Sequence, residues 1–553
     1  MATNGSAMTT PLTRKRKQES VGSPPASVAT KSSKLSTAAT ATAADTDVHP
    51  FFAPRNKKSK SQSLPNCTND NIQQETTATT TITTTEWREY GTPDPVLFVA
   101  TYNNPQPSTK IAAFDLDYTI ISPKGKHLRS KNGDDWMFWH PDVPSKLRQL
   151  HSDGFRILIL SNQYGLAIKT KSEAKKKLEK RKEFKYKVGN VFKQLGVPIT
   201  LLAAIQHDVF RKPSVGMWEW FKRVESNNGK RGQVVEIDME SSFFVGDAAG
   251  RPDNWVKGVR KDFSNSDMLL AWNIGLGFET PTTFFKHKLA PSQPKLGLNA
   301  GEFDPRTYYR TAKQGNAGDD EGQLPLSKIK DVLEEIDCQQ KNSTNSRLVV
   351  VIMVGPPASG KSTISAKHLV RDRGFVHINQ DTLGTKQKCI IELQNAINKA
   401  SDQENSEHSG CCGGVVIDNT NPEEKTRAEY INIIKKSSLY KASKVRIYCV
   451  YMDVSFEIAR HNCSFRLQKN QVRWFEEENL GRVLAGNEDG RDDIKVPFAN
   501  RTIPRMVFNI FYSRLQVPDA KKEGLDKVYR VEFEPDFENE KEERQWRMYH
   551  PIA

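Results

Sequence analysis

The stretch "IAAFDLDYTI" at residues 111–120 places two carboxylates, Asp115 and Asp117, at the end of an apolar run. Aspartate is a poor strand former, so two of them at this point make a chemical role one interpretation and a turn or helix cap the other. An apolar run of this length is typical of a buried strand. The pattern DxDxT therefore predicts two functional carboxylates at the end of a strand.

Further apolar runs, separated by long polar segments of helical character, follow from Trp87 onward. Strands that alternate with helices predict a parallel α/β sheet, and ligands bind beyond the C-terminal ends of such strands. Asp115, Asp117 and Asp247 should therefore lie on one rim of the sheet. The other predicted strands are within "VLFVATY" (96–102), "RILILSN" (156–162) and "SSFFVGDAAG" (241–250).

Composition limits the class of protein. The 553 residues have room for two or three domains, and hydrophobic residues make up 37%. Apolar stretches long enough to span a membrane are absent from the sequence, and seven cysteines without a CxxC pattern indicate reduced thiols inside a cell. The net charge of +15 favours an anionic partner such as nucleic acid.

The composition also changes along the chain, which predicts five segments. Residues 1–85, rich in Ser, Thr, Ala and Pro, are expected to be a disordered basic tail. A first α/β domain is expected over 86–310 and a second over 346–535. The polar segment 311–345 is interpreted as a linker, and 536–553 as a charged C-terminal tail.

The DxDxT pattern can support phosphate chemistry. Asp115 can attack phosphorus to form an aspartyl-phosphate, and Asp117 can act as general acid and then as base. Both carboxylates are candidate Mg²⁺ ligands, because Mg²⁺ prefers one or two carboxylates with phosphate oxygens. Thr119 is expected to orient Asp117 and help to bind phosphate. A lone DxD is equally compatible with turn or capping residues.

Three later motifs support the catalytic interpretation. "LSNQ" offers Ser161 and Asn162 as phosphate-binding donors, and "RKPSVGM" offers Lys212 to stabilise the aspartyl-phosphate. "VGDAAGR" ends a strand with Asp247, a further metal carboxylate. The order DxDxT, SN, K, GD resembles that of the haloacid dehalogenase phosphatases.

A second site follows the apolar strand "LVVVIMV". The segment "GPPASGKST" (355–363) matches GxxxxGK[ST], whose backbone N–H groups surround the phosphates of ATP. Lys361 is expected to reach the β/γ-phosphates and Ser362 to bind Mg²⁺. The expected ATP-binding residues of this loop are Gly355, Pro356, Pro357, Ala358, Ser359, Gly360, Lys361, Ser362 and Thr363.

Two further segments supply candidates for the phosphate acceptor site. Asp381, in "NQDTLG", can take a proton from an incoming hydroxyl, although a helix N-cap is the alternative. Asp418 and Asn419, after the strand "GVVI", are expected to lie near the substrate. Arg460 and Arg466 can hold the transferring phosphoryl group, the alternative being a solvated helix face.

Taken together, residues 88–535 resemble the bifunctional polynucleotide kinase 3′-phosphatases. The stretches "FVGDAAGRPDNW" and "KDFSNSD" carry this resemblance more specifically than the two general motifs. It implies that Asp115 attacks a DNA 3′-phosphate and Asp117 protonates the departing oxygen. It also implies that Asp381 activates a 5′-hydroxyl toward ATP, with Mg²⁺ at both sites. DNA strand ends would be the partner, and the protein is expected to be a monomer.

The chain departs from the family pattern in two places. Vertebrate members carry a forkhead-associated domain ahead of the phosphatase, whereas residues 1–85 show no series of strands and turns. Gln380 stands where many members have arginine. The basic segment 169–187 is interpreted as a solvated helix face, with contact to DNA phosphates as the alternative.

Other functions remain compatible with these motifs. An RNA end-healing enzyme, or a small-metabolite kinase fused to a phosphatase, would use the same general chemistry. A repair scaffold with weak activity is a third interpretation, although Asp115, Lys361 and Asp381 are all present.

The N-terminal tail also contains candidate targeting and docking sequences. Val48 stands three residues before the pair Phe51–Phe52, a spacing that resembles sliding-clamp-binding peptides. The basic clusters "RKRK" (14–17) and "RNKKSK" (55–60) are typical of nuclear localisation sequences. A mitochondrial pool is a further expectation, because the first 44 residues contain a single acidic residue.

Residues 1–85 fused to a fluorescent reporter should therefore bring it to the nucleus, because the clusters are short, basic and expected to be accessible. Fluorescence microscopy measures the nuclear-to-cytoplasmic ratio. A control fusion in which 14–17 and 55–60 carry Gln in place of Lys and Arg should spread through the cell. A wild-type fusion that spreads equally would contradict the prediction.

Overall fold

The computed structural model describes residues 84–91, 94–125, 127–226, 235–285, 296–298, 302–314, 327–342, 348–404, 414–474 and 503–550. The basic clusters at 14–17 and 55–60, and the segment with Val48, Phe51 and Phe52, lie outside these ranges. Of the helices in the described ranges, none has the length and apolar character that a membrane crossing requires.

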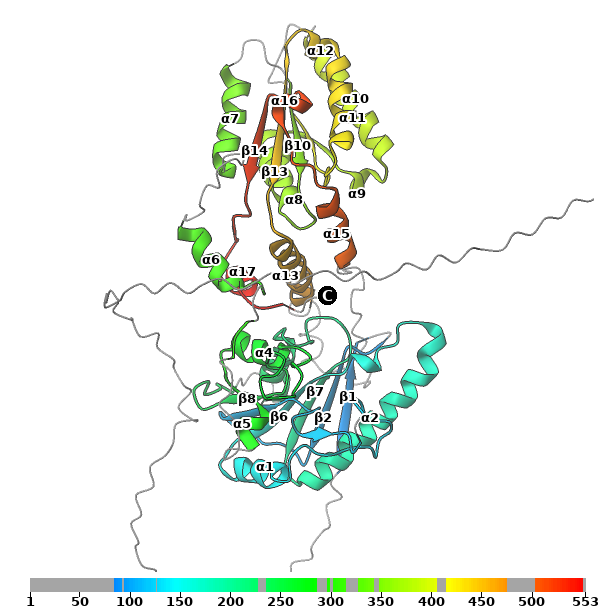
Figure 1. Cartoon of the computed structure of the whole chain (residues 1–553), viewed down its shortest axis with the longest axis vertical. Coiled ribbons are helices and arrows are strands. Elements are labelled where there is room, and N and C mark those ends of the chain that lie inside the picture. Colours follow the sequence, from blue (N-terminus) through cyan, green and yellow to red (C-terminus); the bar gives the residue numbers. More distant parts are fainter. Residues whose placement is uncertain are drawn as a thin grey trace, which may run out of the picture. The chain divides into compact units, whose positions relative to one another are not determined.

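The first domain is built on a seven-stranded sheet with the order β1-β2-β7-β6-β3-β8-β9 (Figure 1). Strands β7, β6, β3, β8 and β9 are parallel, while β2 pairs antiparallel with both β7 and β1. A separate two-stranded hairpin is formed by β4 and β5. The bounds are β1 (Thr85–Tyr90), β2 (Leu97–Tyr102), β3 (Ile111–Phe114), β4 (Ile121–Ser122), β5 (Met137–Phe138), β6 (Arg156–Asn162), β7 (Ile199–Ala204), β8 (Phe243–Val245) and β9 (Gly277–Glu279).

Helices cover both faces of this sheet, because alternate residues of each strand point to opposite sides. Ile157 and Ile159 of β6 pack in the core under α1 and α2, whereas Leu158 and Leu160 pack under α3 and α4. The helices are α1 (Val143–Ser152), α2 (Ala174–Leu195), α3 (Gly216–Trp220), α4 (Ser266–Ile274) and α5 (Pro281–Phe285), with short turns η2 (Tyr164–Leu166), η3 (Lys171–Glu173) and η4 (Phe221–Glu225).

The second domain has a five-stranded sheet of order β11-β12-β10-β13-β14, in which every neighbouring pair is parallel. The fold predicted from the sequence, two α/β domains with parallel sheets, is therefore confirmed, with an antiparallel edge added to the first sheet. The bounds are β10 (Leu348–Val354), β11 (Val376–Ile378), β12 (Gly414–Ile417), β13 (Val445–Met452) and β14 (Lys527–Val531).

This second sheet is also buried on both faces. Ile336 of α7 and Ala459 of α13 pack on one side, while Leu393 of α10 and Ile434 of α11 pack on the other. The helices are α6 (Pro305–Gln314), α7 (Ile329–Asn342), α8 (Lys361–Ile364), η5 (Ser365–Arg371), α9 (Gln380–Leu383), α10 (Lys386–Glu404), α11 (Glu424–Lys436), α12 (Ser438–Lys441), α13 (Phe456–Trp474), α15 (Arg505–Arg514), α16 (Ala520–Glu523) and α17 (Glu540–Trp546).

The segment 311–345 differs from the predicted linker. Residues 329–342 form α7, in which Val332 and Ile336 are 1% and 0% exposed against β10 and β13. Its apolar positions at 329, 332, 333 and 336 have helical spacing, which the polar composition of the surrounding segment obscured. Helix α7 therefore belongs to the second domain, although it lies before the predicted boundary at residue 346.

The C-terminal segment also differs from the predicted charged tail. Residues 540–546 form α17, whose Trp546 is 1% exposed. The Trp546 indole nitrogen donates to Asn462 Oδ1 at 2.8 Å, and Lys469 of α13 pairs with Glu542 at 2.6 Å. Charged residues occupy the outer side of α17, so a buried tryptophan was hidden in a strongly charged stretch.

Ile336→Ala should destabilise the second domain by about 2–5 kcal/mol, because it removes a fully buried side chain. Thermal or urea unfolding of the full chain, followed by fluorescence and circular dichroism, measures the change. Lys330→Ala on the exposed side of the same helix is the matched control and should have little effect. Equal stability of both variants would mean that α7 is not part of the core.

Candidate active sites

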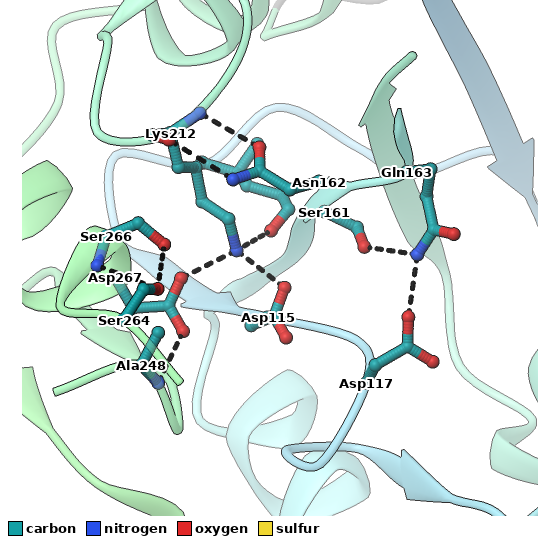
Figure 2. Close-up of polar contacts among 11 residues, drawn as sticks. Asp115, Asp117, Ser161, Asn162, Gln163, Lys212, Ala248, Ser264, Ser266 and Asp267 are labelled. Carbon is teal, nitrogen blue, oxygen red and sulfur yellow. Dashed lines mark hydrogen bonds and ion pairs between the residues drawn. The ribbon is translucent and has the colours of Figure 1, made fainter. Parts of the chain in front are cut away.

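A buried lysine organises the first site. The Lys212 ammonium donates to Asp115 Oδ1 at 2.5 Å and to the Leu160 carbonyl at 2.7 Å, and it pairs with Asp267 at 2.7 Å (Figure 2). Lys212 is 3% exposed and Asp115 is 7% exposed. Asp115 follows β3 directly, and its N–H donates to Val245 of β8, so neighbouring strand ends hold it in place. This network holds one oxygen of Asp115 against the Lys212 ammonium group.

Three carboxylates converge beside this lysine. Asp115, Asp247 and Asp267 each offer an oxygen, and these oxygens lie within 4.8 Å of one another. Asp267 also accepts a hydrogen bond from the Ala248 N–H at 3.0 Å, which ties α4 to the loop after β8. Clustered carboxylate oxygens are the ligands that Mg²⁺ prefers. These residues therefore fit a divalent cation, and Asp267 joins the predicted Asp115 and Asp247 in this cluster.

The pKa shifts within the cluster also favour a cation site. Burial raises the pKa of Asp115 to about 7, against the lowering effect of Lys212 and with a contribution from Asp267 and Asp117. Burial also raises the pKa of Asp247 well above its ordinary value, and Asp267 and Asp115 add to that rise. For Lys212, burial opposes the charge, but Asp115 and Asp267 outweigh it and raise its pKa. A bound cation would relieve this surplus of negative charge.

Asp117 points away from this cluster. Its Oδ2 accepts a hydrogen bond from Gln163 Nε2 at 2.7 Å, and its Oδ1 lies 3.7 Å from the Lys187 ammonium (Figure 2 shows the Gln163 contact). The same Gln163 nitrogen donates to Ser161 Oγ at 2.9 Å. The Asp117 side chain is 43% exposed, so it remains accessible from solvent. Gln163 and Lys187 thus orient Asp117, a role that the sequence assigned to Thr119.

The remaining predicted residues of this site have different surroundings from those expected. Thr119 is fully buried, and within the described ranges its hydroxyl has no hydrogen-bond partner, so it does not hold Asp117. Asn162 uses its side-chain amide on the backbone of Lys212, accepting from the N–H at 2.9 Å and donating to the carbonyl at 3.2 Å. Asn162 therefore positions Lys212, and Ser161, which precedes it at the end of β6, accepts a hydrogen bond from Gln163.

The second site is a phosphate-binding loop at the end of β10. Gly355 has φ +157° and Gly360 has φ +97°, and a Cβ on Gly355 would lie 2.8 Å from Met452 Cβ. Gly360 precedes α8, so the loop closes on a helix N-terminus, where backbone N–H groups bind anions. Ser362, in the first turn of α8, is exposed, which suits the predicted contact to Mg²⁺.

Unlike Lys212, Lys361 forms no ion pair with a carboxylate within the described part of the chain. Its ammonium donates to the Pro356 carbonyl at 2.7 Å and to Ser359 Oγ at 3.2 Å. Burial, with a smaller contribution from the Arg466 charge, lowers the pKa of Lys361 to about 8, while Asp418 and Asp381 act in the opposite direction. Arg466, Asp418 and Asp381 are thus near enough to the loop lysine to act on its charge. A bound polyphosphate would supply the negative charge that this lysine lacks.

Asp381 is not the helix N-cap that the sequence offered as its alternative role, because another residue caps the helix. Asn379 is the N-cap of α9, and its Oδ1 accepts from the N–H groups of Asp381 and Thr382 at 2.8 and 3.2 Å. Asp381 is exposed. Asp418 is 1% exposed, and its Oδ2 lies 3.0 Å from His377 Nε2, while its Oδ1 has no hydrogen-bond partner within the described ranges.

The two arginines of α13 occupy different positions. They are six residues apart, which is about 240° around a helix, so they cannot share one face. Arg466 acts electrostatically on Lys361, whereas the Arg460 guanidinium lies 5.6 Å from the centre of the Phe456 ring. Asn419 accepts a hydrogen bond from the Gln380 N–H at 2.9 Å and so joins β12 to α9. Of the predicted clamp, Arg466 is the member that the structure brings to the loop.

Three side chains of the first site were missed in the sequence: Gln163, Lys187 and Asp267. Gln163 directly follows the predicted Ser161 and Asn162, and Asp267 ends the quoted "KDFSNSD". Both residues therefore stood within motifs that the sequence had already singled out. A glutamine or an aspartate that does not directly follow a predicted strand gives no further indication of its role. Lys187 was one of many lysines in a basic run.

Comparison with known proteins agrees with this geometry. Residues 110–285 match the family described as polynucleotide kinase 3 phosphatase, and residues 350–486 match the AAA domain family. The chain is 32% identical over 438 residues to the bifunctional polynucleotide phosphatase/kinase of Schizosaccharomyces pombe, covering 79% of this chain and 83% of that protein. It is 29% identical to the polynucleotide 3′-phosphatase of Saccharomyces cerevisiae, covering 32% of this chain and 87% of that protein.

The fold and sites thus define a two-domain enzyme that joins a haloacid dehalogenase-like phosphatase to a P-loop kinase. The chain belongs to the bifunctional polynucleotide phosphatase/kinase family.

Asp267→Asn should weaken divalent cation binding at the first site by roughly tenfold or more, because it removes a charged oxygen beside Asp115 and Asp247. Electron paramagnetic resonance of Mn²⁺ added to the nucleotide-free protein measures the affinity. Asp253→Asn, an exposed residue of the same region, is the control and should bind as the wild type does. If Asp117→Asn weakened binding and Asp267→Asn did not, the original assignment of Asp117 would be correct.

Proposed function

We propose that this protein is a DNA end-processing enzyme with two reactions. The first domain removes 3′-phosphates through an aspartyl-phosphate, and the second phosphorylates 5′-hydroxyls with ATP. The observation that best supports the first reaction is the pairing of Asp115 with Lys212 beside an accessible Asp117. Together the reactions would leave the 3′-hydroxyl and 5′-phosphate that strand joining requires.

In the phosphatase, the Asp115 oxygen that faces away from Lys212 attacks the phosphorus. The bond from phosphorus to the 3′-oxygen breaks, and Asp117 gives that oxygen a proton. Asp117, now a carboxylate, takes a proton from water, which attacks the phosphorus and releases inorganic phosphate and Asp115. Gln163 keeps Asp117 oriented through a hydrogen bond of 2.7 Å from its Nε2 to Asp117 Oδ2. Lys212 stabilises the negative charge on the phosphoryl group.

In the kinase, the phosphate-binding loop positions the triphosphate of ATP, and Lys361 and Arg466 stabilise the transferring γ-phosphoryl group. Asp381 takes the proton of the 5′-hydroxyl as its oxygen attacks the γ-phosphorus, and ADP leaves. The exposed position of Asp381 in the first turn of α9 suits this role, because Asn379 rather than Asp381 caps the helix. Asp418 is held by His377 and by the Asn379 side chain.

Mg²⁺ would be held by Asp115, Asp247 and Asp267 in the phosphatase and by Ser362 in the kinase. When bound, it neutralises negative charge on the phosphate oxygens. We also propose a nuclear location and DNA strand ends as the partner. Their support is the net charge of +15, the basic clusters at 14–17 and 55–60, and the relatives' activities on polynucleotides.

The two activities should separate by mutation. Asp115→Asn should lower 3′-phosphatase activity by at least about a hundredfold and leave the kinase intact, whereas Lys361→Ala and Asp381→Asn should do the reverse. Asp381→Asn should still bind ATP, because its partner is the hydroxyl. Both activities are measured on a nicked duplex with 3′-phosphate and 5′-hydroxyl ends, with ATP and Mg²⁺, and folding is checked by circular dichroism.

Matched RNA ends in the same assay separate the DNA proposal from RNA end healing. Higher kcat/KM on DNA supports the proposal, and higher kcat/KM on RNA overturns its substrate. Full phosphatase activity in Asp115→Asn would overturn the aspartyl-phosphate mechanism. Loss of both activities in a normally folded Asp115→Asn would overturn the independence of the two sites.

A further inference from the structure

Helix α2 connects the phosphatase site to exposed positive charge. Its buried side is formed by residues at helical spacing, among them Phe184, Val188, Val191 and Leu195, which pack in the core of the sheet. Figure 1 shows α2 beside β1 and β2 and continuing past the edge of the sheet. The N-terminal half of the helix is mostly exposed and rich in lysine.

One lysine of this helix reaches the catalytic site. Lys187 is 8% exposed, and its ammonium lies 3.7 Å from Asp117 Oδ1. The face of α2 that carries Lys187 is therefore the face directed at the reacting groups. Other side chains on that face, closer to the helix N-terminus, lie along a path that leads away from Asp117.

Helical geometry places two exposed lysines on that path. Lys180 and Lys176 precede Lys187 by seven and eleven residues, so each lies within about 20° of the Lys187 direction, and the row extends about 16 Å along the axis. Both are exposed, and among the described residues neither has an ion-pair partner. Glu183 is the acidic residue in this row. We call Lys176 and Lys180 the α2 track.

A loop beside α2 adds positive charge to the same region. Gly133 packs so closely on α2 that a Cβ there would lie 2.7 Å from the Tyr186 ring and 3.2 Å from the Glu183 carbonyl. The loop is tied to the catalytic segment by Tyr118, whose hydroxyl donates to the Leu128 carbonyl at 2.9 Å. The same loop presents Arg129 and Lys131 to solvent.

We propose that the α2 track binds backbone phosphates of the strand whose 3′-phosphate enters the site at Asp115. This inference rests on the proposed 3′-phosphatase function and names the part of the protein that holds the rest of the strand. A row of about 16 Å spans roughly five nucleotides at 3.4 Å each. The α2 track should therefore contribute to the binding of long substrates and not to the binding of very short ones. This assigns part of the basic segment 169–187 to DNA rather than to solvent alone.

The test compares Lys176→Gln/Lys180→Gln with Lys175→Gln/Lys182→Gln in the full chain. The control pair removes two exposed lysines from the same helix, but they lie about 120–140° away from the Lys187 direction. For a 15-nucleotide strand with a 3′-phosphate, the track variant should show a KM raised severalfold with kcat unchanged. For a dinucleotide 3′-phosphate and for p-nitrophenyl phosphate, both variants should match the wild type.

Salt dependence gives a second readout. For single strands, the slope of log affinity against log salt concentration becomes shallower by about 0.7 for each phosphate that is no longer neutralised. The track variant lacks two lysines, so its slope should be shallower by about 1.4. The control should keep the wild-type slope. Equal KM values and equal slopes for the two double variants would contradict the proposal that the α2 track binds backbone phosphates.

The outcomes also separate the track from the proposed function. If the wild type removes 3′-phosphates but the two variants behave alike, the track is wrong and the proposed function stands. If the wild type has no 3′-phosphatase activity, the proposed function is wrong, and fluorescence anisotropy with an unphosphorylated 15-nucleotide strand still decides whether the track binds DNA. Loss of binding to anionic vesicles in the track variant, with unchanged DNA binding, would assign these lysines to a membrane surface and overturn the proposal.

Discussion

A single buried ammonium group, that of Lys212, determines how the phosphatase site is built. It is shared by Asp115, Asp267 and the Leu160 carbonyl, which belong to three separate segments of the chain. Removal of one partner from a buried ion pair leaves an uncompensated charge, which typically costs about 3–5 kcal/mol. The strand ends of β3 and β6 and the start of α4 are therefore held together by the same group that is suited to stabilise a phosphoryl intermediate.

The two sites use buried lysines in opposite ways. Two carboxylates of the protein raise the pKa of Lys212, so its charge is compensated before any substrate binds. Burial lowers the pKa of Lys361 to about 8, and its direct hydrogen-bond acceptors are neutral oxygens. The kinase lysine therefore gains its compensating charge from a bound polyphosphate. The phosphatase, with its surplus of carboxylates, gains from a cation instead.

Both domains could be recognised from local sequence because their chemistry lies at strand ends. Asp115, Asp247, Asp418 and Lys361 each follow an apolar run at the end of a parallel strand or in the loop beyond it, and such ends meet at one edge of a sheet. The errors arose where composition concealed a pattern. Apolar residues of α7 were diluted in a polar segment, and Trp546 was surrounded by charged residues, so both segments were interpreted as lying outside the core.

Apolar runs, their spacing and the residues directly after them were sufficient to predict two α/β domains, an aspartate at the end of a central strand and a phosphate-binding loop. These features are local, because a strand and the loop that follows it are neighbours in sequence. Side-chain partners are not local. Asp267 joins Lys212 only because α4 packs beside β8, and Lys187 reaches Asp117 only because α2 runs back along the sheet after β6. Such contacts depend on the packing of distant segments, and for that reason the tertiary structure alone decides which charges meet.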